Sequence, residues 1–309
     1  MFRTRLLSGI LLVIIAMATI MSGGRVLAIV LCLVSLIAYK ELTKACEIHV
    51  QDTEQRMQDR TVGNTAVWFT HKGKAGINAP EGVGMVMTVL YYGLLYAALY
   101  RSGEQGDGVA LVYPVIMIVV VMTMIAFLFT YVFTFPRYKA SQIMASMFAF
   151  LYAPVMLSFI YLTREGFPHG NYLVWFIFLC SWGSDTCAYA VGVLIGKHKM
   201  TPKLSPKKSV EGAIGGVVGA ALLFVLYAYF AVNRFSTAAL SLPLVAVLGA
   251  AGAGVSMIGD LAASAIKRDQ GIKDYGKLIP GHGGIMDRFD SVIIAAPLIF
   301  IGLMFLIYG

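Results

Sequence analysis

Charged side chains are scarce in this chain of 309 residues: only 13% are Asp, Glu, Lys or Arg, whereas 59% are hydrophobic. A soluble domain carries about 25% charged residues. The largest polar stretch runs from about 44 to 80 and has few apolar residues from which to build a core. The composition therefore excludes an ordinary soluble domain. It predicts an all-α, polytopic integral membrane protein.

Cysteine is rarer still, with four residues in the chain. The four cysteines lie in or beside apolar segments, without a Cys-x-x-Cys pair and without a histidine at zinc-ligand spacing. We therefore expect four buried, reduced thiols. The sequence also lacks the Gly-Lys-Ser/Thr ending of a P-loop, so its two glycine-rich runs, 212–219 and 249–259, are expected to permit close helix packing rather than to hold a nucleotide.

Long apolar segments are abundant. A helix needs about 20 apolar residues to cross a hydrocarbon core of roughly 30 Å. By this measure the sequence predicts nine spans: 6–21, 25–44, 83–100, 109–131, 143–163, 171–195, 210–232, 238–266 and 288–308. The polar insertion 44–80 then falls between spans 2 and 3. We expect an N-terminal membrane region over 1–140 and a C-terminal catalytic region over 141–309.

Basic residues predict the orientation. Nine spans place successive connecting segments on alternating sides of the membrane. Of the 24 Lys and Arg residues, 20 then lie on the side of the N-terminus, and four lie on the other side: Arg25, Arg101, Arg164 and Arg234. The positive-inside rule then places the N-terminus inside and the C-terminus outside. The same asymmetry explains the net charge of +8 without nucleic acid, because basic residues face an anionic cytoplasmic leaflet.

The most polar segment of the C-terminal half is 264–290, between the last two spans. It holds five cationic side chains, four aspartates, a histidine and five glycines. On a helix, Asp260, Ser264, Lys267 and Arg268 share one face, because they are spaced i, i+4, i+7 and i+8. An acid therefore lies about 10 Å from a pair of cations.

Acids and glycines complete this segment. Asp287 and Asp290, spaced i, i+3, can present their carboxylates together, and Mg²⁺ is typically held by one or two carboxylates plus substrate phosphates. Between the cations and these acids lies the run 280–284, Pro-Gly-His-Gly-Gly, whose glycines allow backbone N–H groups to approach a phosphate. Together these features indicate phosphoryl or nucleotidyl transfer.

Two further polar features lie upstream. Asp185 lies inside span 6, where a charge costs roughly 2.5–3.5 kcal/mol on insertion scales, so a functional role is expected. The run 203–212, Lys-Leu-Ser-Pro-Lys-Lys-Ser-Val-Glu-Gly, is interpreted as a helix start with Ser205 as the N-cap and Pro206 at the first position. Lys207 and Lys208 would then lie in the first helical turn, where an anion is favoured. Glu41, at the inner end of span 2, is expected to snorkel rather than to act in the site.

These motifs resemble those of the phosphatidate cytidylyltransferases, or CDP-diacylglycerol synthases. The resemblance covers Ser264-x-Ile-Lys-Arg268, Lys273-Asp-x-Gly276 and Ile279-Pro-x-His-Gly-Gly-Ile-x-Asp-Arg-Phe-Asp290. The runs Asp185-Thr-x-Ala-Tyr189 and Ser205-Pro-Lys-Lys-Ser-x-Glu-Gly212 are also similar to family motifs. The resemblance implies transfer of CMP from CTP to phosphatidate, with release of pyrophosphate, on the cytoplasmic side of a bacterial inner membrane. By analogy, it also implies a homodimer.

The expected site residues fall into three groups. Asp260 and Asp287 are the leading Mg²⁺ ligands, with Asp290 and Asp185 as additional members, and a monovalent cation sharing the site is left open. Lys267, Arg268 and Arg288 would stabilise phosphate charge, whereas His282 is left between orienting a phosphate, donating a proton and supporting the turn. Substrate contacts are expected from Lys207, Lys208, Ser209, Glu211, Ser264, Gly283 and Gly284. The sequence allows Lys207 and Lys208 to bind either the triphosphate of CTP or the phosphate of the lipid.

Two other functions are alternatives to this one. A CTP-dependent polyprenol or lipid kinase would use the same residue types but would transfer the γ-phosphate. A transporter of an anionic solute would place its charges near the midplane in two related halves, whereas here the polar cluster lies towards one face and no paired half is found. The Asp-Gly-x-x-Ala-Arg motif of the CDP-alcohol phosphotransferases is absent.

Overall fold

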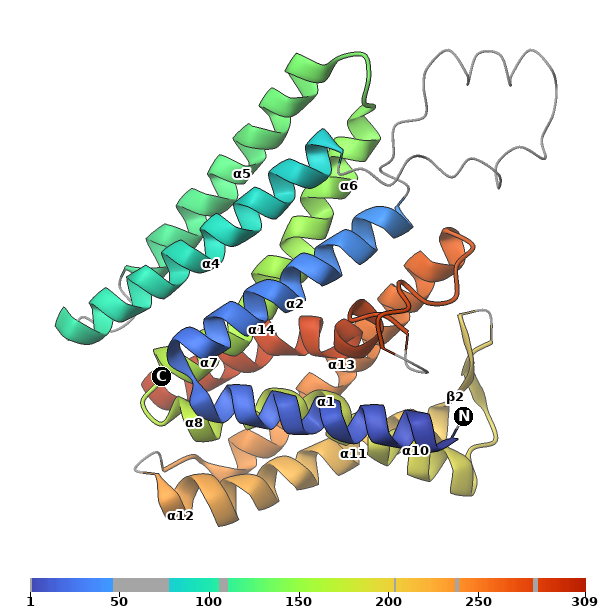
Figure 1. Cartoon of the computed structure of the whole chain (residues 1–309). Helices are drawn as coiled ribbons and strands as arrows, with labels where there is room; N and C mark the ends of the chain where they lie inside the picture. Colours follow the sequence, from blue (N-terminus) through green and yellow to red (C-terminus); the bar gives the residue numbers. More distant parts are fainter. Residues whose placement is uncertain (1, 47–77, 106–110, 203, 237–238, 280–282) are drawn as a thin grey trace.

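The chain folds almost entirely into helices (Figure 1). The structure, a computed structural model, describes residues 2–46, 78–105, 111–202, 204–236, 239–279 and 283–309. Most of the predicted insertion 44–80 and the histidine at 282 lie outside these ranges. The N-terminal helices are α1 (Phe2–Ser22), α2 (Gly24–Ala45), α4 (Ala79–Gln105), α5 (Val112–Thr134), α6 (Ala140–Phe150), the π-helical turn η2 (Leu151–Val155) and α7 (Met156–Gly166).

The C-terminal half contributes the remaining elements. They are α8 (Gly170–Leu173), α9 (Trp175–Phe178), the π-helical turn η3 (Leu179–Gly183), α10 (Ser184–Ile195), α11 (Val210–Tyr227), the π-helical turn η4 (Ala228–Val232), α12 (Asn233–Phe235), α13 (Leu242–Asp269) and α14 (Met286–Tyr308). Two short antiparallel strands, β1 (Lys199–Thr201) and β2 (Ser205–Ser209), join α10 to α11. The all-α class is confirmed, with this one small hairpin among the described residues.

Eight helical segments are long and apolar enough to cross a membrane, so the polytopic membrane class is also confirmed. They are Gly24–Ala45, Ala79–Arg101, Val112–Thr134, Ala140–Gly166, Gly170–Ile195, Val210–Phe235, Leu242–Asp269 and Met286–Tyr308. They correspond to eight of the nine predicted spans. The predicted span 6–21 falls in α1, and among the residues whose side chains the structure describes, the apolar part of this helix is Leu12–Ser22. The count of nine, the orientation and the division at residue 140 stay predictions.

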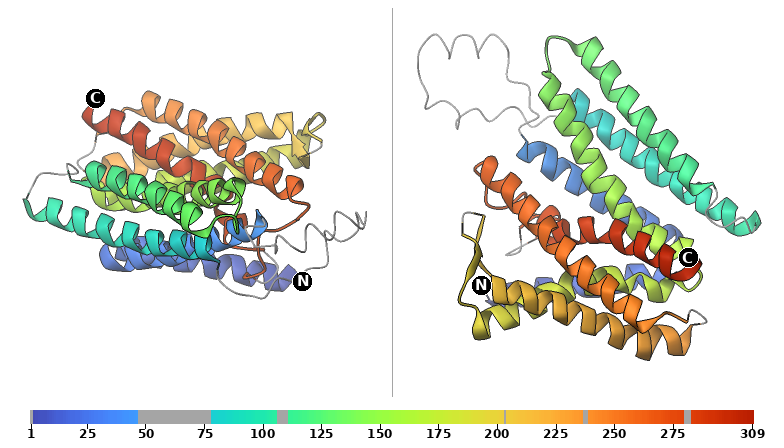
Figure 2. Two further views of the ribbon diagram at one scale, coloured as in Figure 1. Left: turned by 90° about the horizontal axis from the view of Figure 1, so that it is seen from above. Right: turned by 180° about the vertical axis from the view of Figure 1, so that it is seen from behind.

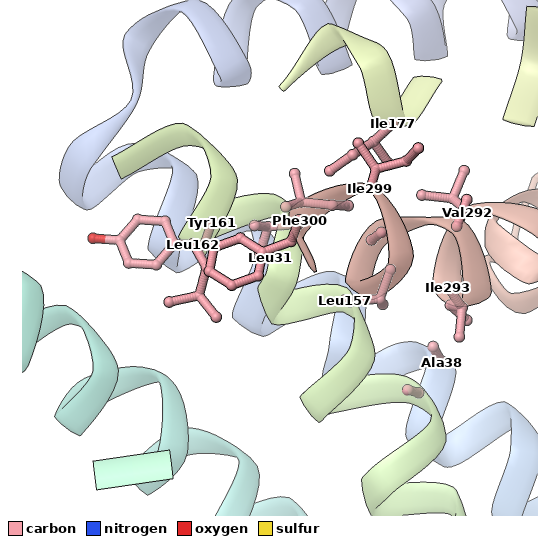
Figure 3. Packing of buried hydrophobic residues seen from close by; sticks show 14 of the residues in the cluster. Leu31, Ala38, Leu157, Tyr161, Leu162, Ile177, Val292, Ile293, Ile299 and Phe300 are labelled. Carbon is pink, nitrogen blue, oxygen red and sulfur yellow. The ribbon is translucent and has the colours of Figure 1, made fainter. Parts of the chain in front are cut away.

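Helix α14 lies at the centre of the packing. It contacts α2, α7, α9 and α13, while α4 and α5 lie towards one side of the molecule and α10 to α12 towards the other (Figures 1 and 2). Val292, Ile293 and Ile299 of α14 are fully buried against residues of α2, α7 and α9 (Figure 3). The helix that carries the predicted acids at its N-terminus is thus held in the buried core.

A π-helical turn interrupts the helix of span 6 just before its acid. Turn η3 ends at Gly183, and α10 begins with Ser184 and Asp185. Single π turns inside helices are frequent at functional sites, because they shift the register of the side chains that follow. The carboxylate of Asp185 therefore projects from the first turn of a re-started helix.

Glycines allow α10 and α11 to pack closely, as the sequence predicts. A Cβ atom on Gly212 would lie 2.7 Å from the backbone oxygen of Ala188, and one on Gly216 would lie 3.1 Å from the backbone oxygen of Ser184. In α13, Gly252 and Gly259 are similarly close to neighbouring side chains, whereas Gly254 has nothing within 4 Å of its Cβ position. Most of the predicted small-residue contacts are confirmed, and Gly254 is the exception.

We expect Gly212→Ala to destabilise the protein by about 1–3 kcal/mol, as overpacking commonly does. The added methyl group meets backbone atoms of α10, which cannot rotate away. Gly254→Ala is the matched control, since its methyl group enters open space and alanine favours a helix over glycine by about 1 kcal/mol. Thermal unfolding in detergent compares the two. Equal midpoints for both variants would contradict the close α10–α11 packing.

Candidate functional site

Two ion pairs mark the site, and each joins two different elements of the fold. Lys208 Nζ of β2 lies 2.5 Å from Asp260 Oδ2 of α13, and Lys267 Nζ of α13 lies 2.9 Å from Asp287 Oδ1 of α14. The C-terminal half of α13 supplies one partner to each pair. The structure therefore brings together the upstream lysine motif and the 264–290 segment, which the sequence predicted separately.

Lys207 and Lys208 lie on a strand, and the predicted helix start at Ser205 is wrong. Residues Ser205–Ser209 pair with β1, and the helix begins at Val210 with Ser209 as its N-cap. The Ser209 hydroxyl accepts a hydrogen bond from Gly212 N at 3.2 Å. Both Ser205 and Ser209 could act as an N-cap, because each is followed by residues whose backbone N–H groups it could accept. The pairing of Ser205–Ser209 with β1, which the local sequence does not show, makes Ser209 the N-cap.

Glu211 holds the hairpin to the helix that follows it. Its carboxylate accepts hydrogen bonds from the backbone N–H groups of Lys197 at 3.1 Å and His198 at 3.2 Å, and it lies 2.6 Å from His198 Nδ1. Val210 N also donates to His198 O at 2.9 Å. In this structure Glu211 and Ser209, both predicted to bind substrate, fix the backbone beside the two lysines. The contribution of His198 was not predicted.

Three aspartates from three helices form an acidic cluster, which we define as Asp185, Asp260 and Asp290. Asp290 interacts electrostatically with both of the others, as Asp185 does with Asp260, and Lys208 and Lys267 lie close to the cluster. The hydroxyl of Ser291 lies within hydrogen-bonding reach of Asp185, and it is also 2.5 Å from Ser181 Oγ of η3. Three of the four predicted metal ligands are therefore neighbours.

Asp287, the fourth predicted ligand, holds the loop that precedes α14. Its side chain is 5% exposed, and its Oδ2 atom accepts hydrogen bonds from Tyr275 N at 2.8 Å and Gly284 N at 3.0 Å. In this structure the Gly284 N–H, which the sequence analysis expected to contact substrate, donates to the carboxylate of Asp287. Tyr275 packs beneath Lys267, with 5.3 Å between the ammonium and the ring centroid, and its hydroxyl donates to Ala263 O at 2.9 Å. Burial raises the pKa of Tyr275, so its hydroxyl stays protonated.

Glu41 also contacts this loop, and the prediction that it snorkels is wrong. Its side chain is buried, with 9% residue exposure, and it accepts hydrogen bonds from Ile285 N at 3.2 Å and Met286 N at 2.8 Å. Free N–H groups at a helix N-terminus favour a carboxylate, and here it comes from a residue 245 positions away from Met286. A Cβ atom on Gly284 would overlap the same carboxylate.

The remaining predicted residues occupy the rim. Ser264, Lys267 and Arg268 line a cavity of about 220 Å³ together with β2, and Arg288 is exposed on the first turn of α14. Gly283 has a φ of +86°, which favours glycine, and its carbonyl accepts a hydrogen bond from Ile279 N at 2.9 Å. The predicted role of His282 falls outside the described residues.

All four cysteines are free thiols, as predicted, although only Cys180 is fully buried.

The acidic cluster fits Mg²⁺ as a site that substrate completes. Among the described residues, no three His, Cys, Asp or Glu side chains are grouped closely enough to hold a metal by themselves. This agrees with a site of one or two carboxylates plus phosphate oxygens. The Nζ atom of Lys208 is buried and has no aligned hydrogen-bond partner among the described residues, despite its short distance to Asp260. A buried ammonium with unused donors beside carboxylates suits a phosphate group.

Comparison with known proteins supports the same chemistry. A family model described as the cytidylyltransferase family matches residues 3–306. Proteins named phosphatidate cytidylyltransferase are similar to this chain: that of Haemophilus influenzae is 33% identical over 42% of this chain and 44% of its own length. That of Synechocystis is 41% identical over 44% of each chain, and that of Mycobacterium bovis is 38% identical over 52% of this chain and 50% of its own length.

The chain spans about half the length of the curated relatives it matches. The family model, in contrast, covers nearly all of it, including the acidic cluster, both ion pairs and the hairpin. The protein therefore belongs to the cytidylyltransferase family.

Proposed function

We propose that the protein transfers CMP from CTP to phosphatidate, giving CDP-diacylglycerol and pyrophosphate. An oxygen of the phosphatidate phosphate attacks the α-phosphorus of CTP, and the bond from that phosphorus to the bridging oxygen of the β-phosphate breaks. The observation that carries the proposal is the meeting of the acidic cluster with Lys208 and Lys267. The names of the curated relatives support the same substrates.

The charges suit this reaction because two anions must approach each other. Phosphatidate brings its own nucleophilic oxygen, so no strong general base is needed, and positioning with charge neutralisation should dominate. Lys208 and Lys267 each lie close to a carboxylate, which keeps their ammonium groups beside the acidic cluster before substrate arrives. One or two carboxylates of Asp260, Asp290 and Asp185, with Asp287 beside them, would hold Mg²⁺ together with phosphate oxygens, and the ion when bound would screen the phosphate charges.

The membrane helices bear on where in the cell the reaction takes place. We place the site on the cytoplasmic side of a bacterial inner membrane, where CTP is available, in agreement with the positive-inside asymmetry and with the bacterial relatives. Membrane lipids then supply the second substrate from the bilayer. A homodimer is proposed by family analogy alone.

The test uses purified protein in detergent with phosphatidate and CTP labelled at either the α- or the γ-phosphate. We expect label from the α-position to enter lipid, with release of pyrophosphate, only when Mg²⁺ is present. Label entering from the γ-position would instead identify a CTP-dependent lipid kinase. Absence of both labels from lipid, with folded protein and Mg²⁺, would overturn the proposal and return attention to transport of an anionic solute.

A further inference from the structure

The hairpin separates the two lysines that the sequence could not distinguish. Successive side chains of a strand point to opposite faces. Lys208 points to Asp260 and the acidic cluster, whereas Lys207 lines the 220 Å³ cavity. We call this cavity the basic pocket; it is lined by Leu204, Ser205, Pro206, Lys207, Ser264, Lys267, Arg268 and Lys273.

The basic pocket carries an excess of positive charge. Four of its lining side chains are cationic, and none is acidic. Lys267 is neutralised by Asp287, but Lys207, Arg268 and Lys273 form no ion pair with any residue that the structure describes. Three unneutralised cations converging on one concavity concentrate anions there, because clefts lined by one sign of charge focus the field.

The size and place of the pocket favour the phosphate tail of the nucleotide. Sites that enclose a whole drug-sized ligand measure about 300–1,000 Å³; this pocket is smaller and suits phosphate groups without the nucleoside. It lies at the polar end of α13, and Lys207, Arg268 and Lys273 are exposed. Asp260 of the acidic cluster lies about two helical turns before Arg268, further into this apolar helix. A water-soluble polyphosphate therefore reaches the pocket more readily than a lipid phosphate does.

Resting on the proposed function, we infer that the basic pocket binds the β- and γ-phosphates of CTP and the departing pyrophosphate, and that Lys273 is a binding residue for them. Lys207 and Arg268 share this role, while Lys208 serves the reacting phosphates at the acidic cluster. In the sequence, Lys273 stands only as part of the run Lys273-Asp-x-Gly276, and no role is assigned to it there. Its position opposite Lys207 becomes visible only once β2 folds beside α13.

Equilibrium binding of inorganic pyrophosphate, CTP and CMP to the full chain in detergent tests this inference. We expect Lys273→Gln and Lys207→Gln each to raise the Kd for pyrophosphate and CTP about tenfold, equivalent to about 1.4 kcal/mol. The Kd for CMP should change less than twofold. Lys277→Gln is the matched control, because Lys277 is exposed in the same loop and does not line the pocket.

The outcomes separate this inference from the proposed function. Equal pyrophosphate affinity in Lys273→Gln and Lys277→Gln overturns the pocket assignment even where label transfer succeeds. A raised KM for phosphatidate with an unchanged Kd for CTP also overturns it, by assigning the pocket to the lipid phosphate. Failure of label transfer with Lys273-dependent pyrophosphate binding overturns the proposed reaction but supports the pocket as a polyphosphate site.

Discussion

Asp287→Asn is expected to lower turnover by about two to three orders of magnitude, the loss typical when one preorganised electrostatic partner is removed. The carboxylate receives Lys267 on one oxygen and two backbone N–H groups on the other. Asparagine keeps a single acceptor oxygen and presents an NH₂ group that donates. Either the lysine or the loop backbone must therefore lose its acceptor, so that the Lys267 ammonium or the backbone at Tyr275 and Gly284 is released.

Two comparison variants show which role of Asp287 matters. Asp274→Asn changes an exposed acid of the same loop and should leave turnover within about twofold. Asp260→Asn should reduce turnover strongly without loosening the loop, because Asp260 contacts Lys208 instead. Hydrogen exchange of amides 271–279 should therefore accelerate in Asp287→Asn alone. Near-normal turnover in folded Asp287→Asn would show that neither the ion pair with Lys267 nor a metal contact at this carboxylate is needed.

The membrane helices and most of the acidic cluster could be predicted because their signals are local or periodic. A run of apolar residues defines a span whatever it packs against, and the i, i+3 spacing of Asp287 and Asp290 places them on neighbouring positions of any helix. The cost of an intramembrane charge singled out Asp185 in the same way. These arguments need no knowledge of which helix lies beside which.

The hairpin could not be predicted, because its stability depends on a partner. The segment Ser205–Ser209 contains a plausible N-cap followed by proline and two lysines, which is also a reasonable helix start. Pairing with Lys199–Thr201 and the second N-cap at Ser209 decide between the two structures. The difference matters for function, because a helical turn would not have separated Lys207 from Lys208 as the strand does.

Glu41 was misread for a related reason. An acid at the end of a span, beside Lys40 and Lys44, resembles a snorkelling interfacial residue. Its hydrogen-bond donors are backbone N–H groups at the start of α14. Backbone groups are common to every residue, so the sequence does not reveal this contact. The signal that the sequence does hold is an acid within an apolar helix, the same feature that distinguishes Asp185.

Glu41→Gln should reduce turnover by about 100-fold and destabilise the protein by about 1–3 kcal/mol. Both carboxylate oxygens accept backbone N–H groups, so the glutamine NH₂ group faces a donor and leaves one buried N–H unsatisfied. The start of α14 carries Asp287 and Asp290, and a displacement of about 1 Å in a catalytic arrangement can cost about 100-fold in rate. Turnover and thermal unfolding in detergent measure the two effects. Lys44→Ala, exposed three residues along the same helix, should change neither.

A double-mutant comparison ties this effect to the loop. Gly284→Ala places a methyl group against the Glu41 carboxylate and should lower turnover through the same contact. Residues in contact show non-additive effects, so the double variant Glu41→Gln with Gly284→Ala should be no more impaired than the worse of the two single variants. Fully additive losses would mean that the two residues act independently. Non-additive losses would mean that the N-terminal half, through one carboxylate on α2, sets the geometry of a site whose other described residues lie in the C-terminal half.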